Sequence, residues 1–164
     1  MSEGSARHRF VIGVVSDTHG ALPKAALEAL AGADAIVHAG DVVGPGVLEA
    51  LRSLAPVTAV RGNCDTDAAG RALPRVANVV LGGVRVVVAH DRAQLSGSLD
   101  PVVVGARIAV SGHTHVAVIE ELDGVLFVNP GSASTPTGGG PSVARITVAP
   151  DGAVDAEIVR LPVG

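Results

Sequence analysis

Aromatic side chains are almost absent from this chain of 164 residues, which has two phenylalanines, Phe10 and Phe127, and no tryptophan or tyrosine. A protein that binds single-stranded nucleic acid needs aromatic side chains on which bases stack, together with a basic groove. The formal net charge is −4, from 16 acidic and 12 basic residues. The composition therefore argues against general nucleic-acid binding.

Cysteine and lysine are equally scarce, since Cys64 and Lys24 are the single residues of their types. One cysteine cannot form an internal disulfide, which is typical of a protein from a reducing compartment, so we expect a cytoplasmic protein. The single lysine excludes a phosphate-binding loop of the G-x-x-x-x-G-K type.

Long hydrophobic runs are also lacking. No apolar run approaches the ~20 residues that a membrane-spanning helix needs, so we expect no membrane association. The run 10–15 is too short for the core of a signal peptide. Residues 1–9 are predicted to be a flexible N-terminal segment, and residues 10–164 a single domain that is long enough to bury a substantial core.

Short β-branched runs, each stopped by a glycine or a polar turn, make up much of the chain. Continuous apolar runs are typical of strands in a sheet that is covered on both faces. These predicted strands are 10–15, 35–38, 57–60, 84–89, 107–110 and 125–128. Later segments alternate between apolar and polar residues and predict antiparallel strands over 116–121, 143–148 and 154–161.

Two segments between the early strands have the apolar spacing of a helix. We predict helices over 23–31, with Gly32 placed to end it, and over 45–54, with Pro45 at its start. Residues 91–106 are expected to form a loop or a short helix. The alternation of strand and helix predicts an α/β fold.

Residues with metal-binding side chains follow five of the predicted strands. They are Asp17 and His19 after 10–15, Asp41 after 35–38, Asn63 after 57–60, His90 after 84–89, and His113 and His115 after 107–110. Ligand sites in open α/β sheets lie at the carboxyl ends of the strands, where glycine lets the chain turn sharply. We therefore expect these seven side chains to converge at one edge.

Imidazole, carboxylate and amide donors suit Mn, Fe, Ni or Zn. Seven donors are too many for one four-coordinate ion, and they suit two ions that share a carboxylate. Two ions about 3.5–4 Å apart clamp a phosphoryl group and activate a water molecule. They also make a locally positive pocket, so the net negative charge does not exclude an anionic substrate.

The chain resembles the calcineurin-like metallophosphoesterase superfamily in five motifs that occur in the same order. These are Asp17-x-His19, Gly40-Asp41, Gly62-Asn63-Cys64-Asp65, His90 and Gly112-His113-Thr114-His115. Within residues 10–132, the motifs Ser16-Asp17-Thr18-His19-Gly20 and Asn129-Pro130-Gly131-Ser132 make it similar to small bacterial and archaeal phosphodiesterases of the YfcE type. The resemblance implies a four-layer α/β/β/α sandwich of two mixed sheets, with the metals at the sheet edge.

The same resemblance implies the roles of the site residues. Asp17, His19 and His115 would hold one divalent ion, Asn63, His90 and His113 the other, and Asp41 would bridge them. The implied reaction is hydrolysis of a small phosphoester, foremost a phosphodiester, by a hydroxide bound to both metals. Manganese is the first expectation for the ions, with Ni, Fe, Co or Zn as alternatives.

Asn63 and Asp65 are the candidate catalytic residues. Asp65 would act by orienting Asn63 or a ligand imidazole, and a plain turn residue is the alternative. Cys64 and Gly44 stand where larger phosphatases of the superfamily carry the His and Asp thought to protonate the leaving group. We therefore expect a preference for leaving groups that depart without protonation, such as aryl or nucleotide-like esters.

Several alternatives stay open at this point. The chain is expected to be an enzyme, but a non-catalytic protein-interaction scaffold on the same fold, and a phosphomonoesterase or nucleotidase, are the other hypotheses.

Asp91 follows His90 where the family usually has glycine, which leaves the second metal in question. Arg61 and Arg92 are either substrate ligands or solvated charges, and His38 is either a buried residue or one that supports the ligands. The low charge and high apolar content also suggest a homo-oligomer.

Overall fold

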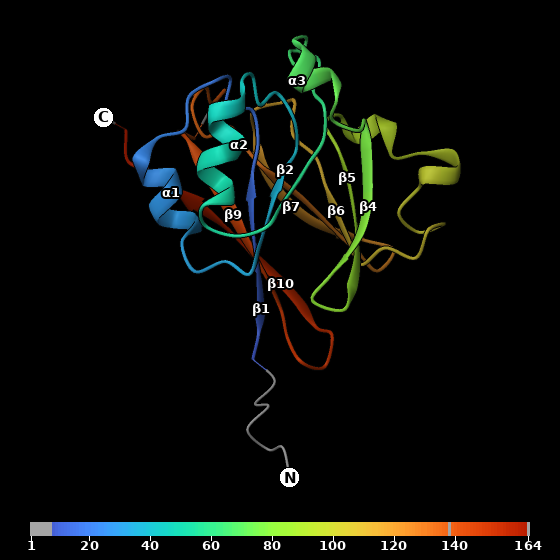
Figure 1. Ribbon diagram of the computed structural model, residues 1–164. Helices are drawn as coiled ribbons and strands as arrows, with labels where there is room; N and C mark the ends of the chain where they lie inside the picture. The colour runs from blue at the N-terminus through green and yellow to red at the C-terminus, as the bar shows by residue number, and fades with distance from the viewer. Residues whose placement is uncertain (1–7, 138, 164) are drawn as a thin grey trace.

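Two five-stranded sheets form the centre of the computed structural model, which describes residues 8–137 and 139–163 (Figure 1). The first sheet has the order β10 (Val154–Arg160), β9 (Ser142–Val148), β1 (Phe10–Val15), β2 (Ala35–His38) and β3 (Val57–Ala59). The second has the order β4 (Val76–Leu81), β5 (Val84–Ala89), β6 (Ile108–Val110), β8 (Val125–Pro130) and β7 (Ala117–Leu122).

Both sheets are mixed. In the first, β1, β2 and β3 are parallel, and β9 and β10 add antiparallel pairs. In the second, β5, β6 and β8 are parallel, and β4 and β7 pair antiparallel at its two edges. The predicted α/β class with two mixed sheets is confirmed.

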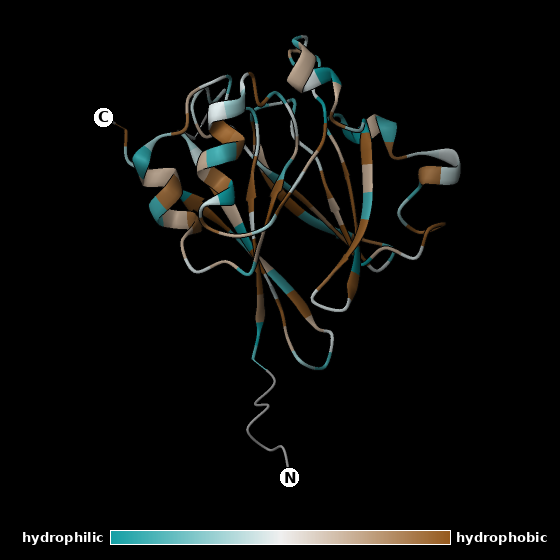
Figure 2. Cartoon of the chain, in the orientation of Figure 1, coloured by the Kyte–Doolittle hydropathy of each residue, from teal (hydrophilic) through white to brown (hydrophobic). Residues whose placement is uncertain are grey.

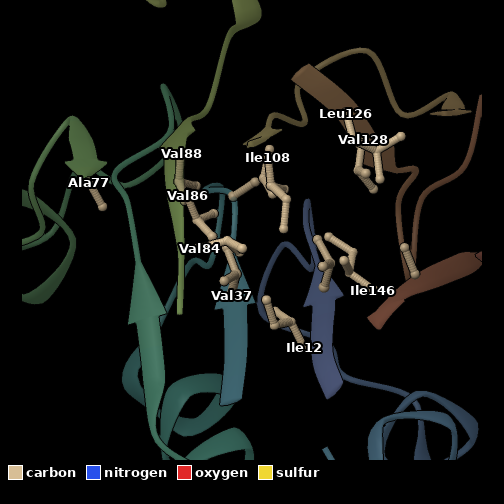
Figure 3. Close-up of a cluster of buried hydrophobic side chains, with 14 of the residues drawn as sticks. Ile12, Val37, Ala77, Val84, Val86, Val88, Ile108, Leu126, Val128 and Ile146 are labelled. Atoms are coloured by element: carbon tan, nitrogen blue, oxygen red, sulfur yellow. The ribbon is translucent and has the colours of Figure 1, made fainter. Parts of the chain in front are cut away.

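The main hydrophobic core lies between the two sheets. Figure 3 shows Ile12, Val37 and Ile146 from the first sheet facing Val86 and Ile108 from the second. All five side chains are fully buried. Because successive residues of a strand point to opposite faces, continuous apolar strands such as β1 and β5 supply this core and an outer layer at once.

Helices α1 (Lys24–Leu30) and α2 (Pro45–Arg52) cover the outer face of the first sheet (Figure 1). Their apolar and polar residues alternate in bands in Figure 2, and Leu30 and Leu51 are the buried anchors, packed against Val15 and Ile36. This one-sided pattern is typical of helices that cover a sheet.

Residues 91–106 cover the outer face of the second sheet. They contain two short 3-10 helices, η1 (Arg92–Gln94) and η2 (Gly97–Leu99), and bury Leu95 and Ala106 against Val87. The sandwich therefore has the four predicted layers, but among the described residues the fourth consists of 3-10 helices and loops, in place of an α-helix.

Two elements were not predicted, α3 (Ala68–Arg71) and β4. With four residues, α3 is too short to show helical periodicity. For β4 a signal exists, since Gly82 and Gly83 have φ of 60° and 87° and connect it to β5. Two residues with positive φ form the tightest hairpin turn, so the Gly-Gly pair between apolar runs indicates the hairpin.

No helix in residues 8–137 and 139–163 is long and apolar enough to cross a membrane. The predicted segment 1–9 lies mostly outside the described residues, so its flexibility stays a prediction.

Candidate metal centre

Loops from both sheets meet at the edge where the parallel strands end. The His113 amide, after β6, donates to Asp17 Oδ2, after β1, and the Ala133 amide, after β8, donates to the Ser16 carbonyl. Asp17 and His19 follow β1, Asp41 follows β2, Asn63 follows β3, His90 follows β5, and His113 and His115 follow β6. The seven side chains therefore come from five strands of two sheets.

Five of these seven residues have a left-handed backbone. The φ angles are 54° at Asp17, 48° at His19, 56° at Asp41, 73° at His113 and 63° at His115. This conformation is uncommon outside glycine, and each such residue costs on the order of 1–3 kcal/mol. Five of them at one sheet edge, held by surrounding structure, indicate a functional site.

Asp17, His19, Asp41 and His115 form one group whose donor atoms all lie within 4.8 Å of one another. Asp17 Oδ1 lies 3.1 Å from His115 Nε2 and 3.9 Å from His19 Nε2. Asp17 Oδ1 and His19 Nε2 are buried atoms with no hydrogen-bond partner among the described residues. Buried polar atoms are normally satisfied, and a cation between these donors would satisfy both, so the group fits a divalent metal.

Asp41 connects this group to His90. Its Oδ2 atom lies 3.6 Å from His19 Nε2 and 3.3 Å from His90 Nε2. His90 Nε2 in turn lies 3.3 Å from His113 Nδ1. Asn63 is exposed, and its side-chain amide contacts the Cys64 thiol at 3.5 Å. The structure thus brings six of the seven predicted ligands together and places Asn63 at the rim.

Hydrogen bonds to backbone carbonyls orient two of the imidazoles. His90 Nδ1–H donates to the Ala39 carbonyl at 2.8 Å, and His115 Nδ1–H to the Thr135 carbonyl at 2.6 Å. A carbonyl only accepts, so each bond fixes the Nδ1 proton and leaves Nε2 as the ring atom that lies near the carboxylates. This arrangement is common among histidines that bind metals.

Backbone and hydroxyl groups hold the two carboxylates. Asp17 Oδ2 accepts from Ser16 Oγ at 2.5 Å and from the His113 amide at 3.0 Å, while Asp41 Oδ1 accepts from the Cys64 amide at 2.8 Å. Burial alone would raise the pKa of Asp41, but the contact with His90, the Cys64 amide and the nearby imidazoles lower this pKa to about 2. Asp41 is therefore ionised at neutral pH, as a metal ligand requires.

Asp65 binds three backbone amides. Its Oδ2 atom accepts from Asp41 N at 2.9 Å and from Gly62 N at 2.8 Å, and its Oδ1 atom from Val43 N at 2.8 Å. Both oxygens of this buried carboxylate are used in this way. Asp65 thus ties the loop after β2 to the loop after β3.

His38 joins the loops after β1 and β2. Its Nδ1 atom accepts from the Gly40 amide at 3.1 Å, so Nε2–H donates to Thr18 Oγ1, 3.0 Å away. The ring is fully buried, and desolvation lowers its pKa to about 4. His38 is therefore neutral at physiological pH and supports the residues around Asp17 and Asp41.

Asn129, near the end of β8, and Ser132, just beyond it, also support the site. Ser132 Oγ donates to the Asp17 carbonyl at 2.7 Å, and Asn129 Nδ2 donates to the Gly112 carbonyl at 3.0 Å. Both residues are buried.

A cavity of about 490 Å³ opens beside His90 and His113, and Asn63 lines it. Arg61, Arg71 and Arg75 line it as well. Sequence analysis missed Arg71 and Arg75, because no local pattern marks α3 and the segment that follows it.

Arg92 has other partners. Its guanidinium pairs with Glu120 at 2.5 Å and lies 4.0 Å from the centre of the Phe127 ring. These contacts hold Arg92 on the covering layer of the second sheet, so of the two arginines considered from the sequence, Arg61 alone lines this cavity.

Curated relatives and a solved structure are similar to this chain over most of its length. A probable metallophosphoesterase of Methanothermobacter thermautotrophicus is 36% identical over 161 residues, covering 92% of each chain. Phosphodiesterase YfcE of Escherichia coli is 35% identical over 150 residues, covering 77% of this chain and 81% of YfcE. The solved structure of E. coli YfcE, described as a phosphoesterase, superimposes with a TM-score of 0.66 at 28% identity, over 93% of this chain and 100% of YfcE.

Vacuolar protein sorting 29 of Cryptosporidium parvum shares the fold, with a TM-score of 0.72 at 24% identity, over 92% of this chain and 97% of that one. The family profile described as the calcineurin-like phosphoesterase superfamily domain matches residues 10–151. With this match and these relatives, the chain belongs to the calcineurin-like phosphoesterase superfamily.

Proposed function

We propose that this protein is a phosphodiesterase that uses two divalent metal ions. Asp17, His19 and His115 would hold one ion, and Asn63, His90 and His113 the other. The observation that carries the proposal is the position of Asp41 Oδ2, which lies 3.6 Å from His19 Nε2 and 3.3 Å from His90 Nε2. A carboxylate between imidazoles of the two sets suits a bridging ligand.

The donor set supports manganese, because carboxylate oxygens and imidazoles together suit Mn and related divalent ions. When bound, two such ions would neutralise the phosphoryl oxygens and activate a water molecule. The protein would orient the ligands, through the carbonyls of Ala39 and Thr135, and leave room for the ester in the cavity lined by Asn63, His90 and His113.

The contacts of Asp65 favour a positioning role over direct catalysis, since both its oxygens accept backbone amides. Asn63 lies at the cavity and is the candidate for direct contact with the substrate. Cys64 is a poor nucleophile, because partial desolvation and the Asp41 carboxylate raise its pKa and keep the thiol protonated.

Alanine variants of two predicted ligands test this proposal. Asp41→Ala and His115→Ala should each lower bound Mn²⁺ and hydrolysis of bis-(p-nitrophenyl) phosphate by about 100-fold or more, because each removes a ligand rather than an outer contact. Metal content and initial rates are the measurements, with circular dichroism to check the fold. His8→Ala and Glu49→Ala, both exposed and outside the site, are the matched controls.

Unchanged hydrolysis in both ligand variants would contradict the assignment. A wild-type protein that binds no metal and hydrolyses no ester would instead fit a protein-interaction scaffold.

Comparing p-nitrophenyl phosphate with the diester separates a phosphomonoesterase from a phosphodiesterase. An alkyl diester hydrolysed as fast as the nitrophenyl diester would contradict the expected preference for leaving groups that need no proton. A cytoplasmic location and a homo-oligomer stay predictions.

A further inference from the structure

Three arginines and two aspartates line the cavity beside the predicted metal ligands. Arg61, Arg71 and Arg75 line it together with His90 and His113. The whole chain has 12 basic residues and a formal net charge of −4. A quarter of the basic side chains of this acidic protein therefore line one cavity.

The acidic side chains of this cavity are committed to other partners. Asp65 accepts three backbone amides, and Asp91 accepts from the Ala93 amide at 3.0 Å. Among the described residues, the only arginine in an ion pair is Arg92, which lies outside this cavity. The guanidinium groups of the three cavity arginines therefore have no ion-pair partner in the described part of the chain and are available to a ligand.

The segment that carries these arginines is held in place. The Arg61 amide donates to the Pro74 carbonyl at 2.8 Å, and Asp67 Oδ1 caps α3 by accepting from the Gly70 amide at 2.7 Å. Gly70 packs so closely that a Cβ there would lie 2.7 Å from the Cβ of Asp65. The segment that carries the arginines is therefore packed against Asp65, which also accepts a hydrogen bond from the Asp41 amide.

We propose that Arg61, Arg71 and Arg75 bind a second phosphate group of the substrate, while the scissile ester lies at the predicted metal ligands. This inference rests on the proposed phosphodiesterase function and narrows its substrate class. A phosphomonoester carries a charge of about −1.5 to −2 and three acceptor oxygens, which suits several guanidinium groups. Guanidinium groups bind phosphate through paired hydrogen bonds.

The size of the cavity favours a small molecule. Its volume of about 490 Å³ lies in the range of small-ligand pockets. The substrate class is therefore a small phosphodiester that also carries a phosphomonoester group.

Two nucleotides serve as probes that differ by one phosphate. By titration calorimetry in Mn²⁺ buffer, wild-type protein should bind thymidine 3′,5′-bisphosphate about tenfold or more tightly than thymidine 5′-monophosphate. The double variant Arg71→Gln/Arg75→Gln should bring the ratio of the two affinities close to one. Arg52→Gln, an exposed arginine of α2 outside this cavity, should leave the ratio at its wild-type value.

A ratio near one in the wild-type protein, or a ratio that the double variant leaves unchanged, would overturn the inference. Hydrolysis of bis-(p-nitrophenyl) phosphate is measured in parallel. A protein that is inert on this ester but shows the arginine-dependent ratio would disprove the proposed function and leave the second-phosphate subsite standing. A protein that hydrolyses this ester but binds the two nucleotides with equal affinity would disprove the second-phosphate subsite and leave the proposed function standing.

Discussion

At the scale of single residues, two glycines decide where the carboxylates of the site lie. A Cβ at Gly62 would meet the backbone nitrogen and the carboxylate of Asp41, and one at Gly112 would lie 2.6 Å from Asp17 Oδ2. Both glycines therefore let a loop pass directly against a buried aspartate. Residues that are not predicted metal ligands therefore position the ligand side chains.

Gly62→Ala is expected to weaken Mn²⁺ binding by about 10–100-fold, because the added methyl group displaces the Asp41 carboxylate without removing it. Overpacking of this kind also costs about 1–3 kcal/mol of folding free energy. Titration calorimetry gives the affinity and urea unfolding the stability. Gly46→Ala is the control, since a Cβ there meets nothing within 4 Å. Wild-type affinity in a folded Gly62→Ala protein would show that Asp41 does not hold metal.

At the scale of elements, neighbouring strand ends are coupled by buried polar side chains. His38 at the end of β2 contacts Thr18 in the loop after β1, and Asp65 after β3 binds amides after β2. Because these side chains are buried, their hydrogen bonds contribute to both loop order and stability.

The His38 contact predicts a pH-dependent stability. Its pKa is about 4 in the folded protein and near 6.5 when unfolded, so the unfolded state takes up the proton first. The stabilisation is complete above pH 6.5 and is lost as the pH falls towards 4, with a loss of about 2 kcal/mol at pH 5. Urea unfolding at pH 7.5 and 5.0, in EDTA, measures this.

His38→Asn serves as the comparison, because asparagine keeps an acceptor for the Gly40 amide but does not titrate. The variant should lose about 2 kcal/mol less than the wild-type protein between the two pH values. Groups that titrate in both proteins, such as His90, cancel in this difference. Equal losses would mean that His38 is not the group responsible.

At the scale of the whole molecule, the candidate site exists because two sheets pack together. Asp17, His19 and Asp41 come from the first sheet, and His90, His113 and His115 from the second. Asp17 and Asp41 are 0% and 2% exposed, and their donor atoms belong to a group spanning less than 4.8 Å. Two carboxylates so close repel each other, and a cation between them removes this cost.

Divalent metal is therefore expected to stabilise the folded protein. Mn²⁺ at 100 times its dissociation constant adds about 2.7 kcal/mol, which raises the Tm of a domain of this size by about 5–10 °C over the value in EDTA. Differential scanning calorimetry measures the shift. Asp17→Asn should reduce it strongly, and Asp151→Asn, in the exposed turn between β9 and β10, should not. A Tm that is the same in Mn²⁺ and EDTA would contradict the metal site.

The sequence by itself determined the strands of the two sheets except β4, the two longer helices and the residues that carry metal-binding groups. Apolar runs such as 10–15 and 84–89 were recognisable because a strand buried on both faces has a continuous apolar pattern. The donors were recognisable because each follows such a run at a glycine or polar turn. Local sequence contains all of this information.

The tertiary structure alone decided how the two sheets combine those groups. The distances around Asp41, the three amides bound by Asp65 and the arginine lining of the cavity all involve residues from separate loops. α3 shows most clearly what the sequence does not reveal, since four residues have no periodicity, and Arg71 and Arg75 line the cavity from a segment that Gly70 packs against Asp65. Contacts between distant segments leave no local pattern, so packing had to place them.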